Sequence, residues 1–217
     1  MTVWAVVVAA GQGRRFGGPK QFVDVGGCRL VDRSVAAART VAAGVVLVLP
    51  APSLPPEGDG VAAHGADVVV TGASTRAGSV RAGLAAVPAT AEVIVVHDGA
   101  RPLASPALFR AVVEAVAEGA DAAVPGLALT DTVKRVDHGV VRATVERHDL
   151  VSVQTPQAFR AEVLRRAHAG GDEATDDAGL VEALGATVRV VPGDARNVKV
   201  TTRADLDLVR VLLEGLA

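Results

Sequence analysis

Short apolar runs alternate along the chain with segments whose apolar residues recur at helical spacing. The first run, residues 3–10, is unbroken, uncharged and rich in branched side chains, as expected of a buried strand. Similar runs predict further strands at 45–49, 67–70, 93–97, 121–125 and 187–191. Helical spacing predicts helices at 30–42, 75–87, 106–119, 160–169, 174–185 and 203–216. This alternation indicates an α/β fold with a largely parallel sheet.

Polar residues stand where several of these helices are predicted to begin. Ser74 or Thr75 can cap the second helix, and Ser105, which precedes a proline, can cap the third. Thr175 is the expected cap of the helix at 174–185, with two aspartates in its first turn. A proline- and glycine-rich stretch at 50–60 is expected to be a loop or a weak helix, without a function.

Residues 126–158 interrupt the alternation of strands and helices. Two extended runs flank Asp137-His138-Gly139 within this region, so the sequence predicts a hairpin. An exposed hairpin has unpaired strand edges that must be covered. We therefore expect one domain over residues 1–217, with an arm at 131–153 as a subregion within it.

The composition fits a single domain with a substantial core. Half of the 217 residues are hydrophobic, but only Trp4 and four phenylalanines are aromatic, so valine, leucine and alanine must pack the core. Basic and acidic residues number 22 and 24, which gives a net charge of −2. This balance gives no support to nonspecific binding of nucleic acid or of a membrane surface.

Cys28 is the only cysteine of the sequence. A single thiol excludes an intramolecular disulfide and cannot form a zinc cluster. No apolar run is long enough to cross a bilayer, and the chain starts directly in a predicted core strand without a basic leader. We therefore expect a cytoplasmic protein.

The first strand leads into a loop rich in glycine and cations, residues 11–20. The loop contains four glycines, the pair Arg14-Arg15 and Lys20. Glycine lets the backbone approach a ligand with its N–H groups turned outward, and the three cations favour a polyanion such as a triphosphate. The loop lacks the Gly-Lys-Ser/Thr of a Walker motif, and Phe16 replaces the third glycine of a dinucleotide-binding fingerprint.

Asp98 stands at the end of the strand predicted at 93–97. Because ligands of open α/β sheets gather beyond the carboxyl ends of strands, we expect Asp98 to lie near the glycine loop. Asp-Gly is also a common turn sequence. A nucleoside triphosphate enters with Mg²⁺, which takes carboxylate and phosphate oxygens, so Asp98 is a candidate contact of the metal, directly or through water. We expect Arg101 to brace the neighbouring loops by pairing with a carboxylate.

Several motifs carry a resemblance to a known family. A-A-G-x-G-x-R followed by P-K-Q resembles the signature loop of the small nucleotidyltransferases that join a nucleotide to a sugar or polyol phosphate. Later blocks narrow the match: V-H-D-G-A-R-P (96–102), D-T-V-K-R (131–135), T-V-E-R (144–147), Q-T-P-Q-A-F (154–159), A-T-D-D-A (174–178) and N-V-K-V-T (197–201). In this order, and over essentially the whole chain, they are similar to 2-C-methyl-D-erythritol 4-phosphate cytidylyltransferases.

The resemblance implies a fold, a reaction and partners. The fold would be a Rossmann-like three-layer nucleotidyltransferase fold with a protruding β-hairpin dimerisation arm. The reaction would be cytidylyl transfer from CTP to the polyol phosphate, with Mg²⁺ or another divalent cation as cofactor. The expected assembly is a homodimer in which each arm helps to complete the active site of the neighbouring subunit.

The resemblance also implies roles for individual residues. Arg15 and Lys20 would contact the triphosphate, and Lys199 the α-phosphate from the opposite side. The remaining nucleotide-binding positions would be Ala10, Gly11, Gly13, Ser79 and Asp98, with Asp98 also the metal position. Thr132 and Arg147 would hold the polyol phosphate from the neighbouring subunit. Ala73 and Ser74 stand where the family has a glycine and an acidic residue, which leaves the contact with the base open.

Other functions compete with this interpretation. A ribitol-5-phosphate cytidylyltransferase would share the loop and the chemistry but take a different polyol. A non-catalytic nucleotide-binding homologue would be expected to have lost its cations, whereas Arg15, Lys20 and Lys199 are all present. A nicotinamide-dependent dehydrogenase is disfavoured by the glycine loop.

Overall fold

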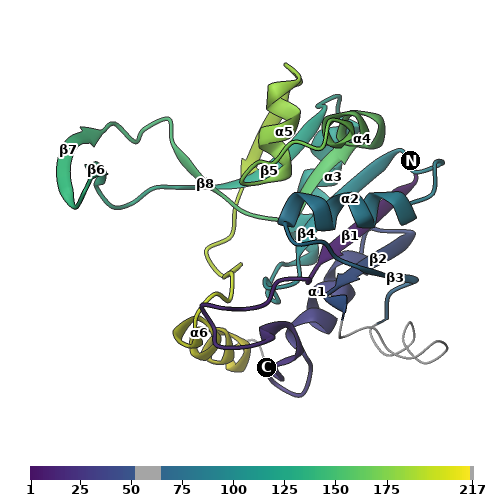
Figure 1. Cartoon of the computed structure of the whole chain (residues 1–217), viewed down its shortest axis with the longest axis horizontal. Helices are drawn as coiled ribbons and strands as arrows, with labels where there is room; N and C mark the ends of the chain where they lie inside the picture. The colour runs from purple at the N-terminus through teal and green to yellow at the C-terminus, as the bar shows by residue number, and fades with distance from the viewer. Residues whose placement is uncertain (52–64, 216–217) are drawn as a thin grey trace.

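The structure, a computed structural model, describes residues 1–51 and 65–215 (Figure 1). Its sheet has the strand order β10-β5-β9-β4-β1-β2-β3, with β8 beside β5. The strands are β1 (Val3–Val8), β2 (Gly44–Leu49), β3 (Val68–Thr71), β4 (Val93–Asp98), β5 (Ala122–Ala128), β8 (Val151–Val153), β9 (Gln157–Arg160) and β10 (Val188–Pro192). Strands β8 and β9 pair antiparallel to their neighbours, and the other pairings of this sheet are parallel. The predicted α/β fold with a largely parallel sheet is confirmed.

Strand β1 explains why the first apolar run has no polar interruptions. It lies between β2 and β4 in the middle of the sheet. Val3, Ala5 and Val7 join the core on one face of the sheet, while Val6 joins the core on the other face. A strand buried on both faces needs apolar side chains at successive positions, because alternate residues point in opposite directions.

Helices cover both faces of the sheet and produce three layers. Helices α1 (Leu30–Arg39) and α3 (Pro106–Ala117) pack into one core. Helices α2 (Arg76–Ala86), α4 (Ala161–Ala169) and α5 (Asp177–Ala183) pack into the other. No helix within the described part of the chain has the length and apolarity that a bilayer crossing demands.

The last helix, α6 (Arg203–Glu214), packs beside the glycine loop instead of on the sheet (Figure 1). Its buried Leu206 and Val209 form a third apolar cluster with Phe16 of the loop. A capping box fixes its start: the side chains and backbone N–H groups of Thr202 and Asp205 bond reciprocally. Helix α6 therefore packs against the glycine loop that follows β1.

The predicted hairpin is confirmed and projects from the body of the molecule (Figure 1). Strands β6 (Val133–Asp137) and β7 (Val140–Val145) form a separate two-stranded sheet. At the turn, His138 and Gly139 take the positive φ angles, 45° and 78°, that a tight hairpin requires. Val136, Val140 and Val141 are each more than half exposed, so the arm presents apolar side chains to its surroundings.

Some predicted boundaries were wrong. Thr75 and Ser105 cap α2 and α3 as expected, but Asp176, not Thr175, caps α5 by accepting a hydrogen bond from the Gly179 N–H. Strands β8 and β9 were not predicted: both are short, β8 follows the arm, and β9 directly precedes α4. The loop predicted at 50–60 falls largely at 52–64, outside the described residues.

Candidate active site

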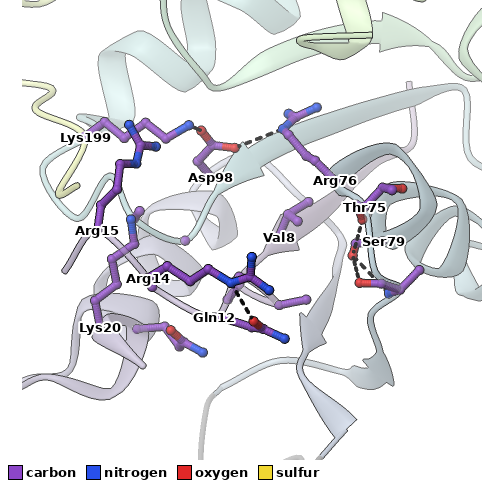
Figure 2. A pocket seen from close by; sticks show the side chains of 18 of the residues that line it. Val8, Gln12, Arg14, Arg15, Lys20, Thr75, Arg76, Ser79, Asp98 and Lys199 are labelled. Carbon is purple, nitrogen blue, oxygen red and sulfur yellow. Dashed lines mark hydrogen bonds and ion pairs between the residues drawn. The ribbon is translucent and has the colours of Figure 1, made fainter. Parts of the chain in front are cut away.

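A cavity of about 580 Å³ lies beyond the carboxyl ends of the central strands (Figure 2). Val8 at the end of β1 is in register with Asp98 at the end of β4, so the glycine loop and Asp98 leave the sheet at the same edge. The N-terminus of α2 and Lys199 complete the wall. The residues that line the cavity include Ala10, Gly11, Gly13, Arg14, Arg15, Lys20, Arg76, Ser79, Asp98 and Lys199. Eight of them are positions expected for the nucleotide or for catalysis.

The glycine loop folds around a single carbonyl oxygen. The N–H groups of Phe16, Gly17 and Gly18 all point to the Gly13 oxygen, at 2.9, 2.9 and 3.2 Å. Gly13 has a φ of +63°, and a Cβ atom at this position would lie 1.8 Å from the Gly18 oxygen. Only glycine fits there, which explains why the second glycine of the motif stands at position 13.

Lys20 lines the cavity at the end of the glycine loop. Its ammonium donates to the Val200 carbonyl at 2.5 Å, which ties the glycine loop to the C-terminal segment. Burial and, after it, the charge of Lys199 lower the pKa of Lys20. The two lysines expected to converge on the phosphates therefore share one cavity.

Asp98 is buried and lies between two cations (Figure 2). One carboxylate oxygen is 2.6 Å from the Lys199 ammonium and the other is 3.5 Å from Nε of Arg76. Burial alone would raise the pKa of Asp98, but Lys199 and then Arg76 outweigh it and hold the pKa well below the usual range. Asp98 is therefore a fixed negative charge that orients the surrounding cations.

Arg76 was not among the residues predicted for the site. It is the first residue of α2, and its guanidinium contacts Asp98 and, at 2.8 Å, the buried Asp177 of α5. Both partners follow it in the sequence, 22 and 101 residues further on, so no local motif signals this contact. Thr75, its neighbour, was interpreted correctly as a helix cap.

A chain of hydrogen bonds through His97 and Thr155 holds the backbone of Asp98 in place. Nε2 of the buried His97 donates to the Arg101 carbonyl at 3.2 Å, so Nδ1 accepts from the Thr155 hydroxyl, also at 3.2 Å. The Thr155 oxygen in turn accepts from the Asp98 N–H at 3.0 Å. Burial lowers the pKa of His97 to about 4, so this histidine is neutral near pH 7 and keeps the tautomer that the chain requires.

Arg101 braces the loops, but through a different group from the one predicted. Its guanidinium donates to the Asn197 carbonyl at 2.7 Å, where we expected a carboxylate partner. Asn197 donates in turn to the Thr155 carbonyl at 2.9 Å. These bonds connect the end of β4 with the segment that carries Lys199.

Ser79 lines the cavity with its hydroxyl already engaged. It accepts from the Ala73 N–H at 3.0 Å and donates to the Thr75 carbonyl at 2.8 Å. The hydroxyl therefore shapes the turn before α2, where Ala73 and Ser74 replace the expected glycine and acidic residue.

Comparison with known proteins identifies the family. The model of the 2-C-methyl-D-erythritol 4-phosphate cytidylyltransferase family matches residues 3–215. The chain belongs to this family. It is 47% identical over 216 residues to the enzyme of that name from Rhodococcus jostii, covering 98% of this chain and 95% of that protein.

Two further relatives extend the comparison. A protein named bifunctional enzyme IspD/IspF from Clavibacter michiganensis is 51% identical over 213 residues, which cover 93% of this chain but 52% of that longer protein. The crystal structure of the 2-C-methyl-D-erythritol 4-phosphate cytidylyltransferase from Thermus thermophilus superposes with a TM-score of 0.81 at 39% identity, covering 96% of this chain and 98% of that chain.

The two arm residues expected to hold the polyol phosphate do not reach this cavity within one chain. Thr132 is exposed just before β6, and neither it nor Arg147 lines the cavity. Arg147 donates to the carbonyls of Leu129 and Asp131, both at 3.0 Å, at the base of the arm.

The cavity offers a magnesium ion a single carboxylate. Asp98 is the only acidic residue among the described residues that line it. Within residues 1–51 and 65–215, no group of three or more His, Cys, Asp or Glu side chains is placed to hold a metal. Mg²⁺ at a nucleotide commonly takes one or two carboxylates in addition to phosphate oxygens. The residues present therefore fit an ion that the phosphates would hold, with Asp98 as its protein contact through water, because both Asp98 oxygens already face Lys199 and Arg76.

Proposed function

We propose that the chain transfers the cytidylyl group of CTP to 2-C-methyl-D-erythritol 4-phosphate, giving 4-diphosphocytidyl-2-C-methyl-D-erythritol and pyrophosphate in the non-mevalonate isoprenoid pathway. The observation that carries this proposal is the convergence of Arg15, Lys20 and Lys199, from opposite ends of the chain, on one cavity beside the glycine loop. Family membership supports the choice of substrates.

The attacking group in this reaction is already an anion. A phosphate monoester is largely a dianion near neutral pH, so the nucleophile needs no general base. The obstacle is the approach of one anion to another, together with the charge that builds on the α-phosphoryl oxygens and on the departing pyrophosphate. Preorganised cations in a partly desolvated site lower this barrier.

The proposed roles of the cations follow from where they lie. Arg15 and Lys20 sit on the glycine loop, where they would bind the triphosphate and stabilise the departing pyrophosphate. Lys199 approaches from the C-terminal segment and would stabilise the α-phosphoryl group. A magnesium ion held by the phosphates would add positive charge at the same group. The loop N–H groups directed to Gly13 maintain the loop shape that presents these side chains.

We further propose a homodimer in which the arm completes the polyol-phosphate site. The exposed valines of β6 and β7 provide apolar surface for a second subunit, and the exposed hairpin edges would be covered by it. Thr132 and Arg147 would then bind the phosphate of the polyol in the partner's cavity. The single cysteine supports the additional proposal of a cytoplasmic enzyme.

A pyrophosphate-release assay tests the function. The purified chain is mixed with each of CTP, UTP, ATP and GTP, and each nucleotide is crossed with 2-C-methyl-D-erythritol 4-phosphate and ribitol 5-phosphate. The expected result is release with CTP and the methylerythritol phosphate. Preferential turnover of ribitol 5-phosphate would establish the alternative activity, which the names of the relatives do not favour. Binding of CTP without release would indicate a non-catalytic homologue.

A further inference from the structure

Asp98 has a second counter-ion that the proposed chemistry does not use. Lys199 contacts one carboxylate oxygen at 2.6 Å, and Arg76 contacts the other oxygen at 3.5 Å from the opposite side (Figure 2). The Lys199 side chain is 41% exposed, whereas the Asp98 side chain is 10% exposed. A flexible, half-exposed lysine is thus held by a carboxylate that is itself fixed from elsewhere.

Arg76 is anchored independently of the cavity. Its Nη2 lies 2.8 Å from an oxygen of Asp177, a residue that is only 1% exposed. The other Asp177 oxygen lies 3.0 Å from Nε2 of the buried His168. Arg76 therefore connects the end of β4 to the first turn of α5, and its anchor at Asp177 does not involve Lys199.

Binding of a triphosphate would weaken the contact between Lys199 and Asp98. To reach the α-phosphoryl group, Lys199 must exchange some of its contact with Asp98 for phosphate. A buried carboxylate that loses its partner is strongly destabilised, and an unpaired negative charge beside the triphosphate would also repel it. A counter-ion that stays with Asp98 removes both penalties.

We propose that Arg76 is a positioning residue for the transfer reaction: it remains paired with Asp98 while Lys199 engages the phosphate. This inference rests on the proposed function. Arg76 contacts no reacting atom in this role and acts through Asp98 alone. Its contribution should therefore disappear when the charge of Asp98 is removed.

A double-mutant cycle tests this dependence. Arg76→Gln should lower kcat/KM for CTP by about tenfold in the otherwise wild-type chain, the size expected of a strongly coupled pair. In the Asp98→Asn background the same substitution should change kcat/KM by less than about twofold. Single-turnover measurements with excess enzyme keep slow variants measurable. An equal loss in both backgrounds would overturn the inference.

Two further variants separate positioning from a general loss of structure. Arg76→Lys keeps a cation and should retain most of the activity, and a loss as large as that of Arg76→Gln would also overturn the inference. Arg81→Gln is the matched control, because Arg81 lies on the same helix and pairs with Glu173 and the Asp172 carbonyl. The kcat/KM of Arg81→Gln for CTP should remain close to that of the wild type.

The same measurements distinguish this inference from the proposed function. Thermal unfolding of each variant gives the folded fraction to which the rates are normalised. A wild-type chain that releases no pyrophosphate refutes the proposed function and the inference with it. If the wild type is active but Arg76→Gln lowers kcat/KM by the same factor in both backgrounds, only the proposed role of Arg76 is refuted and the proposed function stands.

Discussion

Lys20 and Lys199 line one cavity from opposite ends of the chain, and burial together with the charge of Lys199 lowers the pKa of Lys20. Two like charges remain close because their neighbours compensate them. Asp98 contacts Lys199, and the Val200 carbonyl accepts a hydrogen bond from Lys20. A polyanionic substrate would relieve the remaining repulsion, which supports the proposed role of the pair in binding the phosphates of CTP.

Removal of either lysine should therefore affect the chemical step. We expect Lys20→Ala and Lys199→Ala each to lower kcat on the order of 10²-fold or more, because each removes one preorganised stabilising group. Steady-state pyrophosphate release checks this. Arg189→Ala serves as the control, since Arg189 pairs with Glu118 on the surface and lies outside the cavity. Wild-type turnover by either lysine variant would refute its assignment.

The glycine loop gives a second prediction. Gly13 and Gly17 both have positive φ angles, +63° and +92°, but a Cβ atom would collide with the Gly18 oxygen only at Gly13. Gly17→Ala should therefore show only the backbone cost of about 1 kcal/mol, with near-normal CTP affinity. Gly13→Ala must displace the loop and should weaken CTP binding at least tenfold in calorimetric titrations. Equal effects of the two substitutions would contradict the proposed loop geometry.

Six of the eight strands of the sheet could be predicted because local patterns specify them. An apolar run specifies β1 at the centre of the sheet, and glycines followed by cations specify the glycine loop as part of the cavity wall. Asp98 follows from its place at a strand end. The cap of α5 could not be predicted, because Thr175 and Asp176 are both good caps and the fold selects between them.

The contacts of Arg76 could not be predicted from sequence patterns. Its proposed role depends on Asp98 and its placement on Asp177, and these two residues are brought together only when α2 and α5 pack on the same face of the sheet. A charged residue at the start of a helix is usually solvated, so its sequence context gave no reason to single it out. Strand β9 escaped detection for a similar reason, because it enters a mainly parallel sheet in the opposite direction.

The arm makes a prediction about how subunits share a site. If Lys20 and Arg147 act in one site but come from different chains, a heterodimer of a Lys20→Ala chain and an Arg147→Ala chain has one intact site. It should show about half the wild-type activity. Co-expression with two different tags isolates this heterodimer, and sedimentation confirms its mass.

The matched control places both substitutions on the same chain and pairs it with a wild-type chain. Each site of this heterodimer then lacks one of the two residues, so its activity with the polyol phosphate should be strongly reduced. Sites built within single chains would give the reverse order of activities. Arg142→Ala near the arm tip, where Arg142 pairs with Asp137, should leave the KM for the polyol phosphate unchanged.

His97 predicts how stability depends on pH. Its pKa falls from 6.5 to about 4 on folding, mainly through burial. Between these values the unfolded chain binds a proton that the folded chain does not, so the free energy of unfolding should decrease as the pH falls. The slope is about 1.4 kcal/mol per pH unit, and the loss stops growing below a pH of about 4.

Urea unfolding between pH 7 and pH 5 measures this effect with little contribution from carboxylates, whose ordinary pKa values are lower. His97→Gln keeps a donor and an acceptor without a titrating group, so its unfolding free energy should decline less steeply than that of the wild type. His138→Gln, at a side chain that is 93% exposed, should retain the wild-type slope. Parallel slopes for His97→Gln and the wild type would mean that the imidazole takes up a proton in the folded chain as readily as in the unfolded chain, and the hydrogen-bond chain to Asp98 would then have to be reassigned.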